Sequence, residues 1–365
     1  MISAWLYEYI YLLLIMVLTL YQYSRYSRYS RYSWSRVLRP ASQNNLSALI
    51  LAIGLAIFIG FRPVSRLFGD TVNYNRYYQY ILGERFVFDW DATDIVFENL
   101  LTYFASLSID VKYFFLLIAA IYFGGMFIAC RKLFPRDAMY ALLVILGAFS
   151  TFSYGVNGIR AGAAASIFLI AIAYKDKRLL SYLLMALSYG IHHSMQVLII
   201  AYIVVSLVKQ PKYYLWLWVF SFIMALLHVS FFQHLFAGFT DEAGAGYLVF
   251  DATEESVYIT GFRLDFIIYS AMPILVGYYL IFKRKLQSER FNFIYNLYVL
   301  ANSVWLLCIY ASYTNRIAYL SWQLLPIVLI YPFFNEKLYP QQYKQANYIA
   351  LAHLAFTLFM AFVYY

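Results

Sequence analysis

Long apolar segments alternate with short polar ones along the whole chain. Apolar runs of this kind are typical of helices that cross a lipid bilayer, which need about 17–25 residues each. Several runs are shorter, and the pair 179–191 and 194–208 fits either two short helices or one broken helix. We predict an all-α, polytopic integral membrane protein with about 12 transmembrane helices. The runs lie near residues 4–20, 46–60, 111–130, 138–155, 159–174, 179–191, 194–208, 213–232, 263–282, 291–310, 317–334 and 346–363.

The composition supports this interpretation. Of the 365 residues, 64% are hydrophobic and 12% are charged, whereas soluble proteins carry about 45–50% and about 25%. No polar stretch is long enough for a soluble domain, so we expect one transmembrane domain over residues 1–365. Glu8 in the first run argues against a cleaved signal peptide. Cys130 and Cys308 lie in apolar runs and are expected to be small packing residues.

The basic residues indicate the orientation in the membrane. The net charge is +9, which on a soluble protein would suggest a nucleic-acid partner; here the charges must first be sorted by membrane side. With about 12 helices, one set of loops holds most of the 27 Lys and Arg residues. Retention of Lys and Arg on the cytoplasmic side then places both termini on the other side. Merging 179–191 with 194–208 would scatter the basic loops over both faces, so we keep the two helices separate.

Three loops stand out. Residues 21–45 form a basic cytoplasmic loop in which Tyr-Ser-Arg repeats three times from Tyr23 to Arg31. This strip fits either contact with anionic lipid or a repeat expansion in a tolerant loop. Residues 61–110 are expected to be periplasmic. They contain an apolar stripe at Val96, Leu100, Tyr103, Phe104 and Leu107, whose spacing predicts a helix lying in the membrane interface. Residues 233–262 form a second periplasmic loop, which is acidic and glycine-rich.

Charged residues and histidines recur near helix ends on the side opposite the basic loops. A charge in the apolar zone costs at least about 2.5–3.5 kcal/mol, so it usually faces a cavity and has a function. Ordinary explanations exist for single residues: an interfacial anchor for Arg62, an ion pair with Asp265 for Arg263, and a satisfied polar group for a histidine in a turn. As a set on one face, these residues are harder to explain by structure alone. The candidates are Arg62, Asp70, Arg160, His192, His193, Arg263 and Arg316.

The arginines among these candidates suit a phosphate ligand. The planar guanidinium donates two parallel hydrogen bonds and keeps its charge. Arg160 and Arg263 each open a helix, where free backbone N–H groups add further donors. The small residues Gly158, Gly162 and Ser166 fit close helix packing. Walker, GxSxG and HExxH motifs and a Cys/His metal set do not occur, so we expect no metal and no cofactor.

The same residues carry a resemblance to a known family. Four short motifs occur in order and at similar spacing over about residues 60–335. Each is weak alone, and together they resemble the EpsG family of exopolysaccharide membrane proteins, which is related to Wzy-type O-antigen polymerases. The motifs are Gly60-Phe61-Arg62 with Gly69-Asp70-Thr71 and Tyr74; Asn157-Gly158-Ile159-Arg160 with Ala161 and Ala164; Ile191-His192-His193-Ser194; and Asn315-Arg316 with Tyr319.

The resemblance implies glycan polymerisation at the periplasmic face of the bacterial inner membrane. A glycan on undecaprenyl diphosphate would pass to the non-reducing end of an incoming lipid-linked repeat unit of O-antigen, capsule or exopolysaccharide. The implied partners are the lipid-linked donor and acceptor, the bilayer, a flippase and a chain-length regulator, with no nucleic acid. Such a reaction requires a charged clamp for the diphosphate, an apolar groove for the lipid and a base for the acceptor hydroxyl.

Roles follow for the candidate residues. We expect Arg160, Arg316 and Arg263 to bind donor phosphates, and Arg62 and His193 to assist binding. The base is His192 or Asp70; His192 is favoured because histidine titrates near about pH 6.5 and matches the family's His-x-Ser turn. The neighbouring His193 is expected to point elsewhere.

Two other classes of protein remain open. A lipid-linked sugar flippase or secondary transporter would have a similar helix number, but the two halves of the chain show no internal similarity. An O-antigen ligase or membrane acyltransferase would share the histidine and the arginines. The surface glycan of a strain lacking the gene distinguishes these classes. A polymerase mutant keeps single repeat units and loses long chains, whereas a flippase or ligase mutant loses all repeat units.

Topology gives the first testable prediction. Single cysteines at Gly244 should react with a membrane-impermeant reagent in intact cells, because positive charge keeps the basic loops in the cytoplasm. Cysteines at Lys175 or Lys177 should react only after the membrane is permeabilised. A cytoplasmic Gly244 would contradict this orientation.

Overall fold

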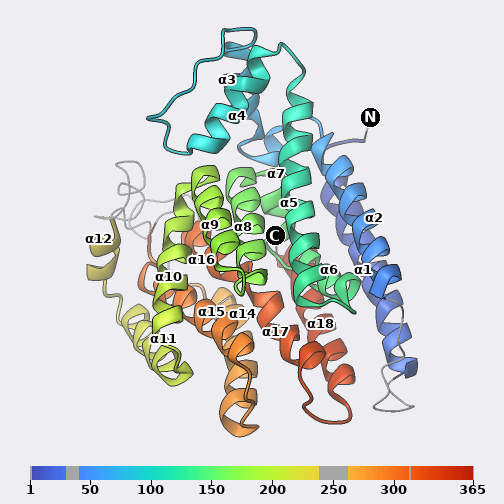
Figure 1. Ribbon diagram of the computed structural model, residues 1–365, viewed down its shortest axis with the longest axis vertical. Helices are drawn as coiled ribbons and strands as arrows, with labels where there is room; N and C mark the ends of the chain where they lie inside the picture. The colour runs from blue at the N-terminus through green and yellow to red at the C-terminus, as the bar shows by residue number, and fades with distance from the viewer. Residues whose placement is uncertain (1, 30–40, 238–261, 312–313, 365) are drawn as a thin grey trace. The chain divides into compact units, whose positions relative to one another are not determined.

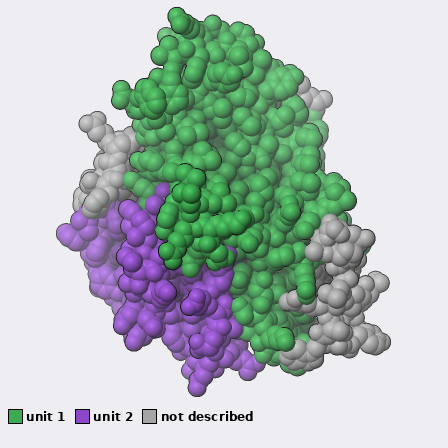
Figure 2. Space-filling view, in the orientation of Figure 1, with its two compact units in different colours: residues 1–196, 330–365 green, residues 197–329 purple. Residues whose placement is uncertain are grey.

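The computed structural model describes residues 2–29, 41–237, 262–311 and 314–364. Within these ranges the regular structure is helical and contains no β-strand, which confirms the all-α prediction. The chain divides into two compact units, and one transmembrane domain over residues 1–365 stays a prediction. Figure 2 colours the first, Met1–Gln196 with Ile330–Tyr365, green and the second, Val197–Leu329, purple.

The first unit contains the amino-terminal helices and the carboxy-terminal one (Figure 1). Its elements are α1 (Leu6–Tyr29), α2 (Ala41–Gly60), η1 (Arg66–Phe68), α3 (Thr71–Tyr80), α4 (Ile95–Ser106), α5 (Val111–Leu133), α6 (Ala138–Leu146), α7 (Thr151–Val156), α8 (Ile159–Ala173), α9 (Arg178–Ile191), η2 (His193–Met195), α18 (Gln342–Phe359) and η4 (Met360–Tyr364).

The second unit is formed by the central helices. Two of its helices, α10 and α17, share their residues with the first unit. The elements are α10 (Gln196–Leu207), α11 (Pro211–Leu226), α12 (Phe231–Ala237), α14 (Leu264–Tyr278), η3 (Tyr279–Lys283), α15 (Glu289–Leu307), α16 (Thr314–Trp322) and α17 (Leu325–Asn335).

Each predicted apolar run corresponds to a helix or to a broken pair of helices. The run 138–155 divides into α6 and α7, and 317–334 divides into α16 and α17. Helices α9 and α10 are separate, because the backbone is extended at His192. Among the described residues, 5 helices are long and apolar enough to cross a membrane, and shorter apolar helices accompany them. The number of about 12 spans stays a prediction.

The expected loops contain more helix than predicted. Helix α1 continues through Tyr29 and α2 begins at Ala41, so residues 21–29 and 41–45 of the expected loop are helical, and residues 30–40 lie outside the described residues. The part of the repeat within α1 contains no glycine or proline that would stop a helix. Residues 61–110 form η1, α3 and α4 in place of an open loop. Of the loop 233–262, residues 238–261 lie outside the described residues.

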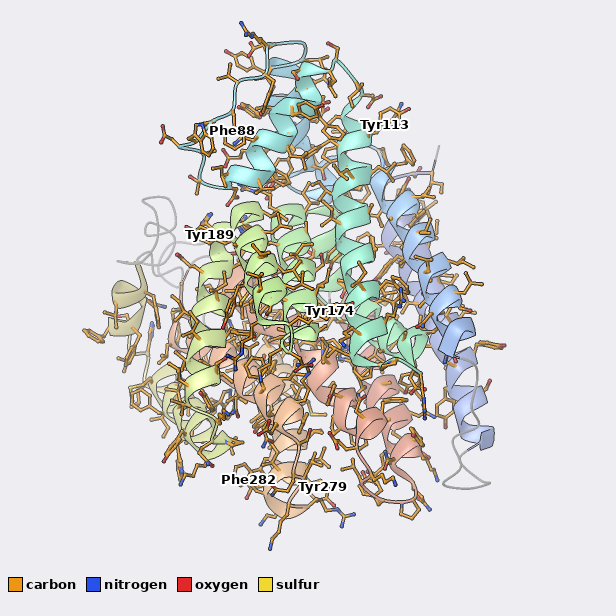
Figure 3. All side chains as sticks on the ribbon, viewed as in Figure 1. Phe88, Tyr113, Tyr174, Tyr189, Tyr279 and Phe282 are labelled. Atoms are coloured by element: carbon orange, nitrogen blue, oxygen red, sulfur yellow. The ribbon has the colours of Figure 1, made fainter. Side chains whose placement is uncertain are left out.

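The helix predicted within residues 61–110 is present as α4. Its most buried side chains, Phe97, Leu101 and Ala105, lie beside the predicted apolar stripe, whose members Tyr103 and Leu107 are exposed. An exposed apolar stripe is what a helix in the membrane interface would present to lipid. The connection between α3 and α4 adds an exposed aromatic pair, Phe88 (labelled in Figure 3) and Trp90, whose ring centroids lie 4.5 Å apart.

Close helix contact organises the first unit. Helix α5 packs against α8, where a Cβ atom added at Gly125 would lie 2.6 Å from Ser166 Oγ. Ser166 Oγ also donates to the carbonyl of Ile121 at 3.1 Å. Gly162 lies equally close to Tyr154, with only 2.7 Å from an added Cβ to its carbonyl oxygen. The small residues of α8 therefore serve helix packing, as predicted.

The break between α6 and α7 is stabilised by side chains from distant helices. A broken helix leaves carbonyl groups without partners, which is costly in an apolar environment. Tyr11 of α1 donates its hydroxyl to the carbonyl of Leu146 at 2.6 Å. Thr357 of α18 donates to the carbonyl of Gly147 at 2.8 Å. Both ends of the chain thus supply hydrogen bonds to the same break.

Buried polar bonds link the helices of the second unit. The indole N–H of Trp218 donates to Asn302 Oδ1 at 2.8 Å, and Asn302 Nδ2 donates to Ser321 Oγ at 3.1 Å. The indole N–H of Trp322 donates to Ser270 Oγ at 2.7 Å. These bonds fix α11, α14 and α16 around the central helix α15.

The glycines of α5 give a stability test. Gly125→Val should lower the melting temperature of the detergent-purified protein, because overpacking costs about 1–3 kcal/mol. Gly124→Val is the matched control, since nothing lies within 4 Å of a Cβ atom added there. Thermal unfolding followed by tryptophan fluorescence measures both. Equal melting temperatures of the two variants would show that the α5–α8 contact accommodates a larger side chain without loss of stability.

Candidate functional site

The site forms where three elements of the first unit meet. Asp94 precedes α4, Arg160 lies in the first turn of α8, and His192 and His193 follow the end of α9. Helix α4 contacts α9, and α9 packs along α8. Helices α3 and α4 lie together beside the beginning of α5 (Figure 1), and they bring Asp94 to the two helices.

Asp94 is placed by the start of its own helix. Its backbone N–H donates to Glu98 Oε1 at 3.1 Å, one turn further along α4. Its side chain makes no capping bond to α4, so the carboxylate is free to bind groups from α8 and α9. The side chain is completely buried. A buried carboxylate requires compensating donors, and the neighbouring elements supply them.

The Asp94 carboxylate lies among four nitrogen atoms. Arg160 Nη1 donates to Oδ2 at 2.7 Å. His192 Nδ1 lies 3.1 Å from Oδ2 and 3.3 Å from Oδ1. The backbone N–H of His193 donates to Oδ1 at 2.9 Å, and His193 Nδ1 lies 2.8 Å from the same oxygen. We call Asp94, Arg160, His192 and His193 the Asp94 cluster.

The electrostatics of the cluster favour an ionised carboxylate. Burial alone would raise the pKa of Asp94, but hydrogen bonds from His192 and His193 outweigh it and hold the pKa well below the ordinary value. Burial lowers the pKa of His192, and Arg160 and His193 lower it further, against the opposing effect of Asp94. His192 is therefore neutral at neutral pH, which leaves one ring nitrogen able to accept a proton.

The cluster is reachable from outside the protein. The side chains of Arg160, His192 and His193 retain 35%, 19% and 26% of their exposure, whereas Asp94 retains none. These three side chains can thus bind a ligand, while the buried Asp94 carboxylate pairs with each of them. A ligand at this position would encounter guanidinium and imidazole nitrogens before the Asp94 carboxylate.

Tyr74 of α3 completes the surroundings of Arg160. The guanidinium carbon of Arg160 lies 5.7 Å from the ring centre of Tyr74 and 5.8 Å from that of Phe97. The Tyr74 hydroxyl hydrogen-bonds to Arg160, and burial raises the pKa of Tyr74. Glu98 adds a favourable charge near Arg160. Arg160 is thereby held over two aromatic rings with part of its fork exposed.

Asp70 belongs to a second group of contacting residues in the first unit, formed by Arg62, Gly69, Asp70, Thr71 and Asn157, which we call the joint. Its backbone N–H donates to Asn157 Oδ1 at 2.9 Å. Gly69, just before it, adopts a φ of +54°, and a Cβ atom there would lie 2.1 Å from Asn157 Oδ1. Only glycine fits this position. The joint connects the start of α3 to the turn before α8. It thereby fixes the position of Tyr74, on α3, next to Arg160, on α8.

Arg62 is a buried part of the same joint. It is only 3% exposed, which differs from the interfacial anchor considered above. Nη1 donates to the carbonyl of Ile59 at 3.0 Å, and Nη2 donates to Thr71 Oγ1 at 2.9 Å and to the carbonyl of Val156 at 3.1 Å. Burial lowers its pKa to about 10. These bonds tie the end of α2 to α3 and α7.

Arg263 and Arg316 belong to the second unit. Arg263 donates Nε to Asp265 Oδ1 at 2.9 Å and Nη2 to Asp265 Oδ2, so the ion pair considered from the sequence is present. Its guanidinium carbon also lies 4.2 Å from the ring centre of Phe266. Arg316 lies in the first turn of α16 and is exposed. Within the first unit, the structure brings together Arg160, His192 and His193 of the predicted site residues.

Two residues of the site differ from the sequence-based expectations. Asp94 was not singled out, because an aspartate before an apolar helix is usually only a cap. The position before α4 was the only signal. The prediction that His193 points elsewhere is wrong, because the chain turns at His192 and both rings reach the same carboxylate.

The cluster also has the donor types of a metal site. The carboxylate and the two imidazoles offer ligand atoms within 4.8 Å of one another, and such sets bind divalent transition metals. Here Arg160 and the His193 amide already donate to the carboxylate. An ion would have to compete with both donors. We therefore interpret the cluster as a hydrogen-bonded one.

The fold and site define a helical membrane protein with a basic, partly exposed cluster. The sequence profile of the EpsG family matches residues 45–365, and the chain belongs to this family. Membership indicates a polysaccharide polymerase type of function at a membrane. The chain has no significant match to a curated protein or to a solved structure.

The joint around Arg62 gives a second stability prediction. Arg62→Gln should lower the melting temperature of the purified protein, because it removes donors from buried carbonyl groups, at about 1–3 kcal/mol. Arg66→Gln, at an exposed position four residues on, should leave it unchanged. If both variants melt like the wild type, Arg62 is not a structural residue.

Proposed function

We propose that the protein polymerises undecaprenyl-diphosphate-linked glycan units at the periplasmic face of the bacterial inner membrane. The product would be an O-antigen, a capsule or an exopolysaccharide. The observation that carries this proposal is the Asp94 cluster, which combines a neutral imidazole with a partly exposed guanidinium in a chain of the EpsG family. This pairing supplies a base for a hydroxyl and a charge for a phosphate.

The reaction requires one proton transfer and one leaving group. The acceptor hydroxyl oxygen attacks the anomeric carbon of the donor glycan. The bond from that carbon to the diphosphate oxygen breaks, and undecaprenyl diphosphate departs with the electron pair. The proton of the hydroxyl passes to the base. Diphosphate leaves as an anion, so the reaction requires no acid, oxidant or further cofactor.

His192 is the proposed base. Its Nδ1 faces Asp94, so the opposite nitrogen, Nε2, is directed away from the carboxylate. A neutral imidazole at neutral pH is suited to accept the hydroxyl proton. Asp70 remains the rival, and its backbone contact with Asn157 leaves the role of its carboxylate open. A carboxylate requires a raised pKa to act as well as histidine.

Arg160 is the proposed diphosphate ligand. Guanidinium carries five N–H donors, and one of them, on Nη1, is directed to Asp94. Tyr74 also hydrogen-bonds to the group, and the donors on its exposed side can reach phosphate oxygens. We propose that His193 assists on the same side, because a protonated imidazole can donate from Nε2 while Nδ1 stays on Asp94.

The other proposed arginines have different support. Arg316 is an exposed first-turn residue, in keeping with phosphate binding by a helix N-terminus. Arg263 has less support, because its fork already binds Asp265. Arg62 is better explained as a residue that positions the loop than as one that touches substrate.

The glycan of a deletion strain tests the function. Loss of long chains with single repeat units retained indicates a polymerase. Loss of every repeat unit from the surface indicates a ligase or flippase and would contradict the proposal. Complementation by the intact gene should restore the full ladder. We propose that a flippase and a chain-length regulator act in the same biosynthetic pathway.

Two variants test the proposed chemistry. His192→Ala should lower the polymerisation rate by about 10²–10⁴-fold, the usual contribution of a general base. His193→Ala should retain more activity and weaken donor binding instead. The measurement is polymer formation by purified protein from lipid-linked units. A wild-type rate for His192→Ala would leave Asp70 as the next candidate base.

Arg160→Ala should abolish long polymer at normal protein level. Arg160→Lys should rescue it only in part, because lysine keeps the charge and loses the fork. Arg178→Ala is the matched control, since Arg178 is exposed at the start of α9. Full-length polymer from Arg160→Ala would exclude the clamp.

A further inference from the structure

One acid serves both histidines of the Asp94 cluster. Both imidazoles direct Nδ1 at the same buried carboxylate, at 3.1 Å from Oδ2 for His192 and 2.8 Å from Oδ1 for His193. Both oxygens also accept from fixed donors, Arg160 Nη1 and the backbone N–H of His193. An ionised carboxylate only accepts hydrogen bonds. Each Nδ1 must therefore carry a proton.

This arrangement determines which nitrogen is basic. A neutral imidazole has one proton, so a proton on Nδ1 leaves Nε2 bare. In His192 the bare nitrogen is then the one that faces away from Asp94, in a side chain that is 19% exposed. The opposite tautomer would direct the lone pair of Nδ1 at a carboxylate lone pair, which is repulsive.

We infer that Asp94 is a positioning residue, which fixes the Nδ1–H tautomer of His192 and thereby presents Nε2 as the base toward the acceptor hydroxyl. An acid that orients a catalytic histidine by this bond recurs on unrelated folds. The inference rests on the proposed function for its catalytic part. The assignment of the proton to Nδ1 stands on the geometry alone.

Asparagine is the informative substitution. Asp94→Asn keeps the size of the side chain and replaces one accepting oxygen with a donating NH₂ group. The backbone N–H of His193 requires an accepting oxygen at the Oδ1 position, so the NH₂ group takes the Oδ2 position beside His192. Nδ1 of His192 must then accept from this group, so the His192 proton moves to Nε2 and the base is lost. Asp94→Glu keeps an acceptor and should restore the tautomer in part. Asp91→Asn, at an exposed position of the same connection, is the matched control.

The tautomer can be measured without any activity. Full-length protein labelled with ¹⁵N-histidine has 5 histidines, and His192→Gln identifies the signals of His192. Bare and protonated ring nitrogens differ widely in ¹⁵N shift. The wild type and Asp91→Asn should show His192 protonated at Nδ1 and bare at Nε2. The Nε2–H form in the wild type would overturn the inference, even if Asp94→Asn does not fold.

Kinetics test the catalytic part. Asp94→Asn should lower kcat by about 10²–10⁴-fold, with little change in the KM of the lipid-linked donor. The double variant Asp94→Asn/His192→Ala should be no slower than His192→Ala, because both changes remove the same base. Additive losses would show a structural role. A faster Asp94→Asn enzyme with tighter diphosphate binding would show that Asp94 blocks the site.

The two readouts also separate the inference from the proposed function. If the wild type shows the expected tautomer and forms no polymer, the function is wrong and the proton assignment stands. If it forms polymer and Asp94→Asn matches the wild type, the positioning role is wrong and the function stands. Where the wild type forms polymer, its activity should be unchanged by EDTA. Loss of that activity would support a metal ion in place of the hydrogen-bonded cluster.

Discussion

The site depends on the burial of one negative charge. Asp94 has no exposed surface, and a carboxylate in that position is stable only with donors around it. Arg160, His192 and the backbone of His193 supply those donors from the consecutive helices α8 and α9, which lie far from Asp94 in the sequence. Removing the acid would leave a guanidinium and two imidazoles facing one another. The packing of α4, α8 and α9 brings these donors to this single group.

The motifs near Gly69 and Asn157 have a mechanical explanation. Asn157 contacts Asp70 through its amide oxygen, and Gly69 leaves the space that this oxygen occupies. Arg62 joins the same joint through the carbonyl of Val156. The joint places Tyr74 over Arg160, three residues after Asn157. The first motif, around Arg62 and Asp70, and the second motif, around Asn157, are thus the two sides of one contact in the structure.

Much of this arrangement could be predicted from the sequence. Hydrophobic runs locate the helices, because their signal is long and periodic, and the paired motifs indicated Arg160 and His192. The break between α6 and α7 could not be predicted, since it depends on Thr357 and Tyr11 as donors from distant helices. Asp94 could not be predicted either. Its role arises from burial, and burial depends on tertiary contacts that no local pattern of residues records.

The position of Asp94 on the segment between α2 and α5 has a consequence for engineering. In the proposed mechanism this segment carries the acid that orients His192. A graft of residues 61–110 from another family member must therefore supply an acid before α4 and a glycine opposite Asn157, or Arg160, His192 and His193 lose their shared acceptor.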